Sequence, residues 1–184
     1  TRIRIRKDCR AIEFIFSDNN LSDFIASFGF PIGKKGNKLF IPKIFYDLNL
    51  VSYVISGFFA TDGSLVLTKN PNKYYPRLEI HVISKRLLKE VYSYMMSLGF
   101  KGAFYRCKRI NINSKLCRRV HPIYRVQFNG KRNLLLFKEL IGFSNPKYED
   151  KSNKFLKYSD DYDYSIKGVS SRLVKEISID KNSD

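Results

Sequence analysis

The sequence lacks the features that mark several common classes of protein. No run of 18 apolar residues occurs among its 184 residues, so nothing in it is expected to span a membrane. The first six residues, from Thr1, alternate charge with apolar side chains and do not resemble a signal peptide. An aromatic content of 15% argues against a disordered basic tail. A chain of this length can bury one sizeable core.

Cysteine and histidine are scarce. Cys9, Cys107 and Cys117 are odd in number and scattered, and with only His81 and His121 beside them they give no usual zinc spacing. This predicts reduced thiols in an intracellular protein, whether in cytoplasm, nucleoid or an organelle matrix. A histidine-metal nuclease needs further ligands at local spacing, and none surrounds His81, which we interpret as a base contact or a surface histidine.

Acidic residues are half as numerous as basic ones, with 17 against 34 and a formal net charge of +17. The segment 101–119 alone carries seven basic residues and no acid. This concentration of positive charge attracts polyanions, and the affinity for them falls steeply as the salt concentration rises. Nucleic acid is therefore the favoured partner, although a ribosome-associated or membrane-surface protein can show the same balance.

The segment 53–63 is an apolar helix pattern that ends in an acid and a glycine. Small side chains recur in it three to four residues apart, so that one helix face can approach another backbone closely. These small residues are Ser56, Gly57, Ala60 and Thr61. Gly63 suits the left-handed residue that stops a helix. Asp62 remains at the C-terminal end, where the helix dipole favours a cation.

Capping residues and hydrophobic periodicity predict ordered elements on both sides of this helix, which itself spans about 50–62. In order, we expect a strand over 10–16, a helix over 21–28, a short helix from Ile41-Pro42, strands over 64–69 and 77–83 joined by a loop at 70–76, a helix capped by Ser84 and stopped by Gly99, strands over 102–110 and 122–129, and a helix over 131–141. The end, 159–184, is polar, and within it 169–177 could form a helix.

Two segments of the sequence share the same order of expected elements, and we call this similarity the internal echo. The order strand, helix, Gly-Phe, Pro, Lys occurs at 11–34 and again at 124–147. If the echo is real, residues 1–36 are the tail of an earlier copy whose own motif helix is missing. An N-terminal extension could produce the same order, so both interpretations stand.

Positions 55–63 and the elements after them resemble the LAGLIDADG homing endonuclease family over about 50–158. The resemblance implies an α+β fold, in which an αββαββα unit presents a concave antiparallel sheet as a DNA-binding saddle. It divides the chain into an N-terminal extension or earlier repeat (1–49), the endonuclease unit (50–158) and a polar tail (159–184). Ala60 replaces the first aspartate of the family motif, at a position that faces helix packing, while Asp62 keeps the acid that carries metal.

The resemblance further implies a site-specific endonuclease, associated with an intron or intein, that cuts double-stranded DNA with divalent metal. Two carboxylates that share metal ions clamp the attacking and leaving oxygens. Mg²⁺ suits this work because it accepts few carboxylates and keeps several waters, and Mn²⁺ is expected to substitute. In the family the main-chain carbonyl before the acid, here that of Thr61, also binds metal, and the family's lysine matches Lys147 or Lys151. Arg86 could reach the phosphates.

One motif supplies only one Asp62, so the second acid must come from a homodimer partner or from a missing N-terminal repeat. A relative that binds without cutting, such as an RNA-splicing maturase or a DNA-binding regulator, is the alternative function. The retained Asp62 argues against it. A ribosome-associated basic protein is weaker still, because no RNA-binding signature is visible.

Alternation at period two predicts two different faces for the sheet. The inner face would hold Leu65, Leu67, Leu78, Ile80, Val82, Tyr124, Val126 and Phe128. The outer face would meet DNA with Ser64, Val66, Thr68, Arg77, Glu79, His81, Arg125 and Gln127. Arginine and glutamine pair with guanine or adenine edges, and Glu79 could accept from cytosine, although an ordinary solvated face looks similar. Arg106, Lys108, Arg109 and the loop 111–121 are expected to contact phosphates.

Overall fold

A computed structural model describes residues 2–6, 11–15, 18–33, 36–70, 73–107 and 122–160. The chain forms two compact units, Thr1–Lys35 and Gly36–Asp184. The expected phosphate contacts Lys108 and Arg109, the basic loop 111–121 and the helix expected at 169–177 all lie outside the described residues.

The first unit is a strand pair followed by a helix. Strands β1 (Arg2–Arg6) and β2 (Ala11–Ile15) are antiparallel, and α1 (Asn19–Ser27) follows. The Asp18 carboxylate accepts a hydrogen bond from the Leu21 amide (3.1 Å), which explains why the helix begins there. The strand and helix expected in this region are confirmed, yet α1 buries none of its residues.

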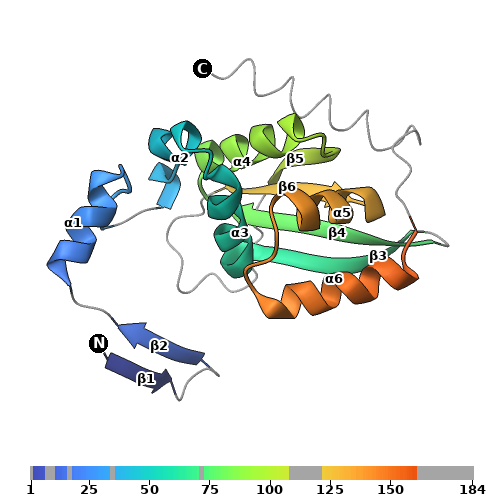
Figure 1. Ribbon diagram of the computed structural model, residues 1–184, viewed down its shortest axis with the longest axis horizontal. Helices are drawn as coiled ribbons and strands as arrows, with labels where there is room; N and C mark the ends of the chain where they lie inside the picture. The colour runs from blue at the N-terminus through green and yellow to red at the C-terminus, as the bar shows by residue number, and fades with distance from the viewer. Residues whose placement is uncertain are drawn as a thin grey trace. The chain divides into compact units, whose positions relative to one another are not determined.

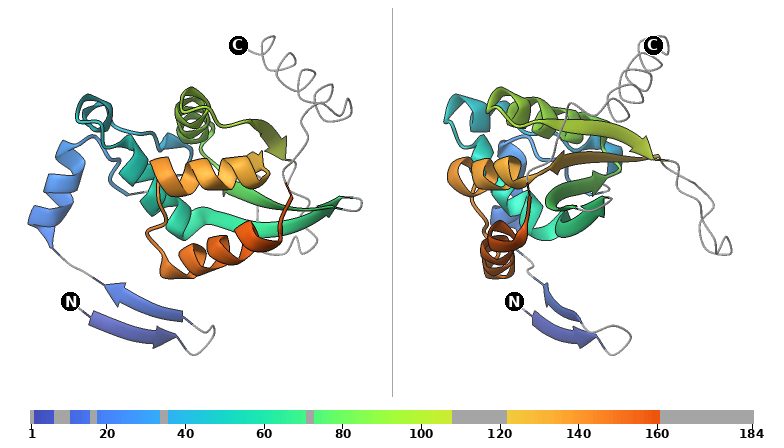
Figure 2. Two further views of the ribbon diagram at one scale, coloured as in Figure 1. Left: turned by 45° about the vertical axis from the view of Figure 1, so that its right-hand side comes forward. Right: turned by 90° about the vertical axis from the view of Figure 1, so that its right-hand side faces the viewer.

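The second unit is a four-stranded antiparallel sheet in the order β3-β4-β6-β5. Its elements are η1 (Gly36–Lys38), α2 (Lys43–Asp47), α3 (Val51–Asp62), β3 (Gly63–Asn70), β4 (Lys73–Val82), α4 (Lys85–Ser97), β5 (Gly102–Cys107), β6 (Ile123–Asn129), α5 (Lys131–Leu140) and α6 (Pro146–Tyr158). Figures 1 and 2 show the helices α3 to α6 gathered on one face of this sheet. The expected α+β fold with an antiparallel sheet is confirmed. No helix among the described residues is long and apolar enough to cross a bilayer.

The core lies between the sheet and its helices, and the alternation of side chains along the strands creates it. Leu65 pairs with Leu78, and Ile80 pairs with Val126, so their side chains share the helix-covered face. All four are at most 2% exposed. Burying side chains of this size contributes about 1.5–3 kcal/mol each, which is why the register cannot slip by one residue.

Phe59 anchors the end of α3 in an aromatic cluster. Its ring centroid lies 4.8 Å from that of Phe137, 5.7 Å from that of Phe143 and 5.3 Å from that of Tyr148. Together with Ile55, one turn earlier, Phe59 fixes the buried face of the helix. The residues that follow, including Asp62, therefore have a defined position over the sheet.

Gly63 ends α3 for a reason other than the one expected. Its backbone is extended (φ −82°, ψ 159°), not left-handed, and the chain passes directly from α3 into β3. A Cβ at this position would overlap the carbonyl oxygen and the ring of Phe59. Glycine is required here by close packing, so the left-handed prediction was wrong.

The hairpin between β3 and β4 is tighter than expected, because β4 already begins at Lys73. The predicted loop 70–76 was therefore too long, and Pro76 lies inside the strand. Pro76 is tolerated because β6 pairs with β4 only from Arg77 onward, so no ladder hydrogen bond to β6 is lost. The carbonyl of Pro76 instead accepts from the Gly130 amide at 2.8 Å.

Helix α6 was not predicted as a separate element. Asn145 caps it, accepting from the Lys147 amide at 3.0 Å, and Pro146 occupies its first turn. Asparagine followed by proline is a recognised helix start, so the signal was present in the sequence.

Candidate active site and nucleic-acid interface

Asp62 is the last residue of α3, and its side chain is exposed. The hydroxyl of Thr61 lies 3.0 Å from a carboxylate oxygen of Asp62 and 3.0 Å from the carbonyl oxygen of Phe58. The carboxylate is thus held beside the last turn of the helix and is accessible to solvent.

The oxygen donors at this helix end fit a hard divalent cation. The last carbonyls of a helix have no partner within the helix, so that of Thr61, one residue before Asp62, is a candidate second oxygen donor. Mg²⁺ binds such oxygens and completes its shell with water. Among the described residues, no three His, Cys, Asp or Glu side chains come together as a metal group. One copy of the motif therefore supplies a single acid at this helix end.

An open stripe runs along α3 toward Asp62. Tyr53 is 71% exposed, and Gly57 and Thr61 follow it at intervals of four residues and are exposed as well. A Cβ at Gly57 would meet nothing within 4 Å. This stripe, Tyr53–Gly57–Thr61, leaves room for another backbone to approach.

Ser56 does not belong to that stripe. It is buried, and its hydroxyl donates to the carbonyl oxygen of Gly142 at 2.8 Å and lies 2.6 Å from the Ser144 hydroxyl. The expectation of one face with four small residues was therefore wrong for Ser56, which packs against its own chain.

The first turn of α6 lies beside the end of α3. The hydroxyl of Tyr148 donates to the main-chain oxygen of Gly63 at 2.7 Å. Lys147 precedes Tyr148 and is exposed, and Lys151 follows one turn later with its ammonium 5.5 Å from the Phe155 ring centre. Both lysines thus lie on the helix that contacts the residue after Asp62. The role of Tyr148 was missed, because a sequence does not show which main-chain oxygen a tyrosine hydroxyl will reach.

Arg86 is engaged elsewhere. Its guanidinium lies 4.2 Å from the Phe40 ring centre and 3.0 Å from Glu90, whose other oxygen accepts from the Ile41 amide at 2.6 Å. These contacts fasten the segment before α2 to α4. No described contact joins Arg86 to Asp62.

The eight predicted outer residues share one face of the sheet, as the register of the strands requires. Ser64 pairs with Glu79 and Glu79 with Gln127, so these three lie in one row across β3, β4 and β6. Neighbouring rows on the same face hold Val66 with Arg77, and His81 with Arg125. Thr68 continues β3 beyond them. Arg106 instead pairs with Tyr124, so it lies on the helix-covered side, where it is exposed.

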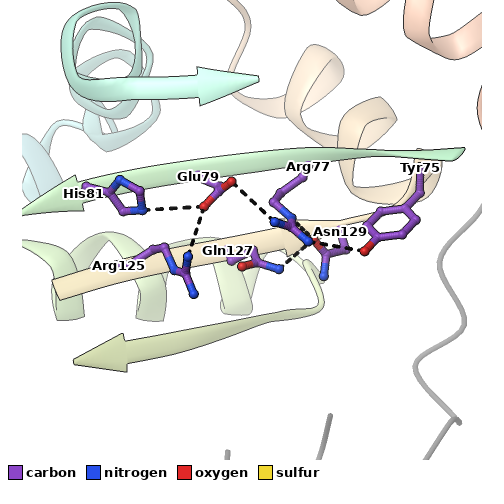
Figure 3. A network of polar contacts seen from close by, with 7 residues as sticks. All are labelled: Tyr75, Arg77, Glu79, His81, Arg125, Gln127 and Asn129. Carbon is purple, nitrogen blue, oxygen red and sulfur yellow. Dashed lines mark hydrogen bonds and ion pairs between the residues drawn. The ribbon is translucent and has the colours of Figure 1, made fainter. Parts of the chain in front are cut away.

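A network of polar side chains connects this face (Figure 3). One oxygen of Glu79 lies 3.7 Å from Nη1 of Arg77, while the other lies 3.6 Å from Nη1 of Arg125 and 3.5 Å from Nε2 of His81. Asn129 accepts from Arg77 at 3.1 Å and from Gln127 at 3.0 Å. The face therefore presents two guanidinium groups in an ordered polar setting.

The family model described as the LAGLIDADG-like domain matches residues 49–142. No single curated protein matches the chain. The matched range spans just over half of the 184 residues. It contains α3, all four strands of the larger sheet and α5. The chain therefore belongs to the LAGLIDADG family.

Proposed function

We propose that this protein is a metal-dependent endonuclease, encoded by an intron or intein, that cuts both strands of a long DNA site. The family comprises nucleases and maturases. The observation that carries the proposal of cutting is the exposed Asp62 at the end of α3, with the Tyr53–Gly57–Thr61 stripe open beside it. A purely structural acid at a helix end would need neither the open stripe nor the neighbouring lysines.

In this proposal, Asp62 and the Thr61 carbonyl hold a divalent ion, Mg²⁺ with Mn²⁺ as a substitute, together with the same groups of a second motif. The ion, when bound, supplies positive charge that acidifies water and neutralises the leaving oxygen. Lys147 and Lys151, both on α6, are proposed to stabilise the charge that develops on the phosphate. Tyr148 keeps α6 beside Asp62 through its hydrogen bond to Gly63.

The outer sheet face is proposed to lie in the major groove, with Arg77, Arg125 and Gln127 toward base edges. Phosphate contacts would come from basic residues around this face; Arg106 is not among them, because the register places it on the helix-covered side. The net charge of +17 supports this, since phosphate contacts supply most of the affinity for DNA.

The open stripe of α3 is proposed to pack against a second motif helix, which would bring the second acid. A second copy of the chain could supply it through a two-fold axis. A missing N-terminal repeat, of which residues 1–36 would be the tail, is the other source, and the first unit supports it. Leu21 and Phe24 of α1 are 46% and 59% exposed, whereas Leu134 and Phe137, at the corresponding positions of α5, are at most 1% exposed.

Sedimentation of the protein with duplex DNA distinguishes between these two sources of the second acid. A complex with two chains per duplex supports the homodimer and predicts a nearly palindromic site. A complex with one chain per duplex on a non-palindromic site contradicts the homodimer and supports the earlier repeat.

Cleavage can be tested on a plasmid library that carries random inserts. The protein is incubated with the library in Mg²⁺ or in EDTA, linear molecules are isolated, and their ends are sequenced. Recurrent ends that appear only with Mg²⁺ and vanish in Asp62→Asn support the endonuclease. Enriched binding of particular inserts with no linear product in any metal would contradict cutting and support a regulator, whereas a preference for intron RNA would support a maturase.

A further inference from the structure

Glu79 occupies an unexpected position for an acid in a strongly basic protein. Among the described residues of the outer sheet face it is the sole carboxylate, and it lies in the central row, only 9% exposed. A carboxylate there repels phosphates, so by itself it weakens binding to DNA. Its presence calls for a compensating role.

The surroundings of Glu79 indicate that role. Guanidinium groups from two different strands, those of Arg77 on β4 and Arg125 on β6, both lie within 3.7 Å of its oxygens. Their Cα positions are four residues apart in the register, which is two rows on this face and roughly 13 Å at about 3.3 Å per residue. Glu79 therefore draws together two long side chains that would otherwise spread along the face.

Each arginine also has a second support on its far side. Arg77 donates from Nε to Asn129 at 3.1 Å and from Nη2 to the Tyr75 hydroxyl at 3.3 Å. Arg125 lies over the Tyr105 ring, 4.8 Å from its centre. A guanidinium held on two sides loses little freedom when it meets a base, and bidentate recognition of guanine requires such a fixed plane.

The distances to Glu79 leave donors available. Charge-assisted hydrogen bonds of this kind are about 2.7–2.9 Å long, whereas the ion pairs here measure 3.6 and 3.7 Å. Glu79 thus attracts the guanidinium groups without taking up their N–H donors in short bonds. The Nη1 donors of Arg77 and Arg125, which face Glu79 at these distances, can still turn to acceptors on a base edge.

We propose that Glu79 is a positioning residue for base recognition, which fixes Arg77 and Arg125 over neighbouring base pairs and weakens binding to arbitrary sequence. The proposal rests on the DNA-binding role proposed above. It differs from a direct contact between Glu79 and cytosine, because the carboxylate acts through the two arginines. Loss of Glu79 should therefore broaden recognition and at the same time strengthen non-specific affinity.

The test compares wild type with Glu79→Gln, which keeps the shape of the side chain and removes its charge. Bound sequences are selected from a random duplex library, and binding to one fixed duplex of arbitrary sequence is measured over a range of salt. We expect preference to fall at a few adjacent base pairs and to persist elsewhere. Binding to the arbitrary duplex should become about fivefold tighter at low salt, since one repulsive charge is lost.

Glu139→Gln is the matched control, because Glu139 is exposed on α5, which covers the opposite face of the sheet. It changes the net charge equally, and we expect its base preference to equal that of wild type. Glu79→Asp keeps the charge with a shorter reach, so preference should weaken locally without tighter non-specific binding. This second variant keeps the test valid if Glu79→Gln does not fold.

Three results would overturn the proposal: unchanged preference at every position, loss spread evenly over the whole site, or weaker binding to the arbitrary duplex in Glu79→Gln. Failure of wild type to bind any duplex is a different outcome, since it would remove the proposed DNA-binding function itself.

Discussion

The hydroxyl of Tyr148 donates to the main-chain oxygen of Gly63 at 2.7 Å, and Gly63 directly follows Asp62. This bond connects α6, which carries the two candidate lysines, to the acid at the end of α3. The hydrogen bond therefore joins the helix that carries the lysines to the end of the helix that carries the carboxylate. Tyr148 also packs its ring against Phe59, so its body and its hydroxyl hold the same junction.

Tyr148→Phe keeps the ring and removes this bond. We expect the free energy of unfolding to fall by about 1 kcal/mol and cleavage to fall more than DNA binding, because α6 loses its link to the acid. Urea denaturation and cleavage rates with saturating protein measure both. Tyr46→Phe, partly exposed on α2, is the control, and equal losses in the two variants would contradict a special role for Tyr148.

Asp62→Asn should abolish cleavage and leave duplex binding within about tenfold of wild type, since phosphate and base contacts elsewhere supply most of the affinity. Gel-shift and cleavage assays on a selected site check this. Asp150→Asn, an exposed change on α6, should cut normally. Strong residual cutting by Asp62→Asn would remove Asp62 from the mechanism.

Two glycines at the same helix should respond to alanine in opposite directions. Gly63→Ala should lower the free energy of unfolding by about 1–3 kcal/mol, because the new methyl group overlaps Phe59. Gly57→Ala should raise it by about 0.5–1 kcal/mol, because open space surrounds it and alanine favours a helix. Urea denaturation of dilute protein without DNA gives both values, and a stable Gly63→Ala would refute the packing explanation.

Gly57→Leu separates folding from assembly. The side chain enters open space on the isolated chain, so the melting temperature should change little. Where a second motif helix packs on the stripe, overpacking costs about 1–3 kcal/mol or more, so assembly and cleavage should weaken together. Full activity with an unaltered sedimentation profile would show that this face packs against no partner helix.

Stability at alkaline pH should depend on Tyr92. Burial raises the pKa of its phenol above the ordinary value of about 10, and its hydroxyl donates to Gly102 at 3.2 Å. The folded state thus favours the neutral form, and this contribution is complete below pH 10 and declines as the pH rises through the raised pKa. Tyr92→Phe should flatten this part of the curve of unfolding free energy against pH above about pH 10, and an unchanged slope would contradict it.

Much of the fold could be predicted from the sequence because burial leaves a strong periodic signal. Leu65, Leu78 and Val126 had to share a face, and the predicted outer set followed from the same alternation. Close packing leaves no such signal. Gly63 looks identical in sequence whether it serves a left-handed turn or, as here, makes room for Phe59.

The candidate site was predictable residue by residue but not as an arrangement. The sequence indicates an acid at Asp62, yet it contains no information on the hydroxyl that will reach Gly63. Likewise Glu79 could be assigned to the outer face, whereas its ion pair with Arg125 depends on β6 lying next to β4. Such strand neighbours are set by tertiary packing and not by local pattern.

The alternation along β3, β4 and β6 has a consequence for how this protein changes over generations. The side chains that stabilise the sheet and those proposed to read DNA point in opposite directions from the same strands, so a substitution at Val66 or Thr68 removes no contact of the hydrophobic core. A lineage that carries this fold can exchange its outer residues one at a time and keep folding throughout. When the target DNA sequence changes by mutation, single substitutions on the outer face can restore recognition, and each leaves the fold intact for the next substitution.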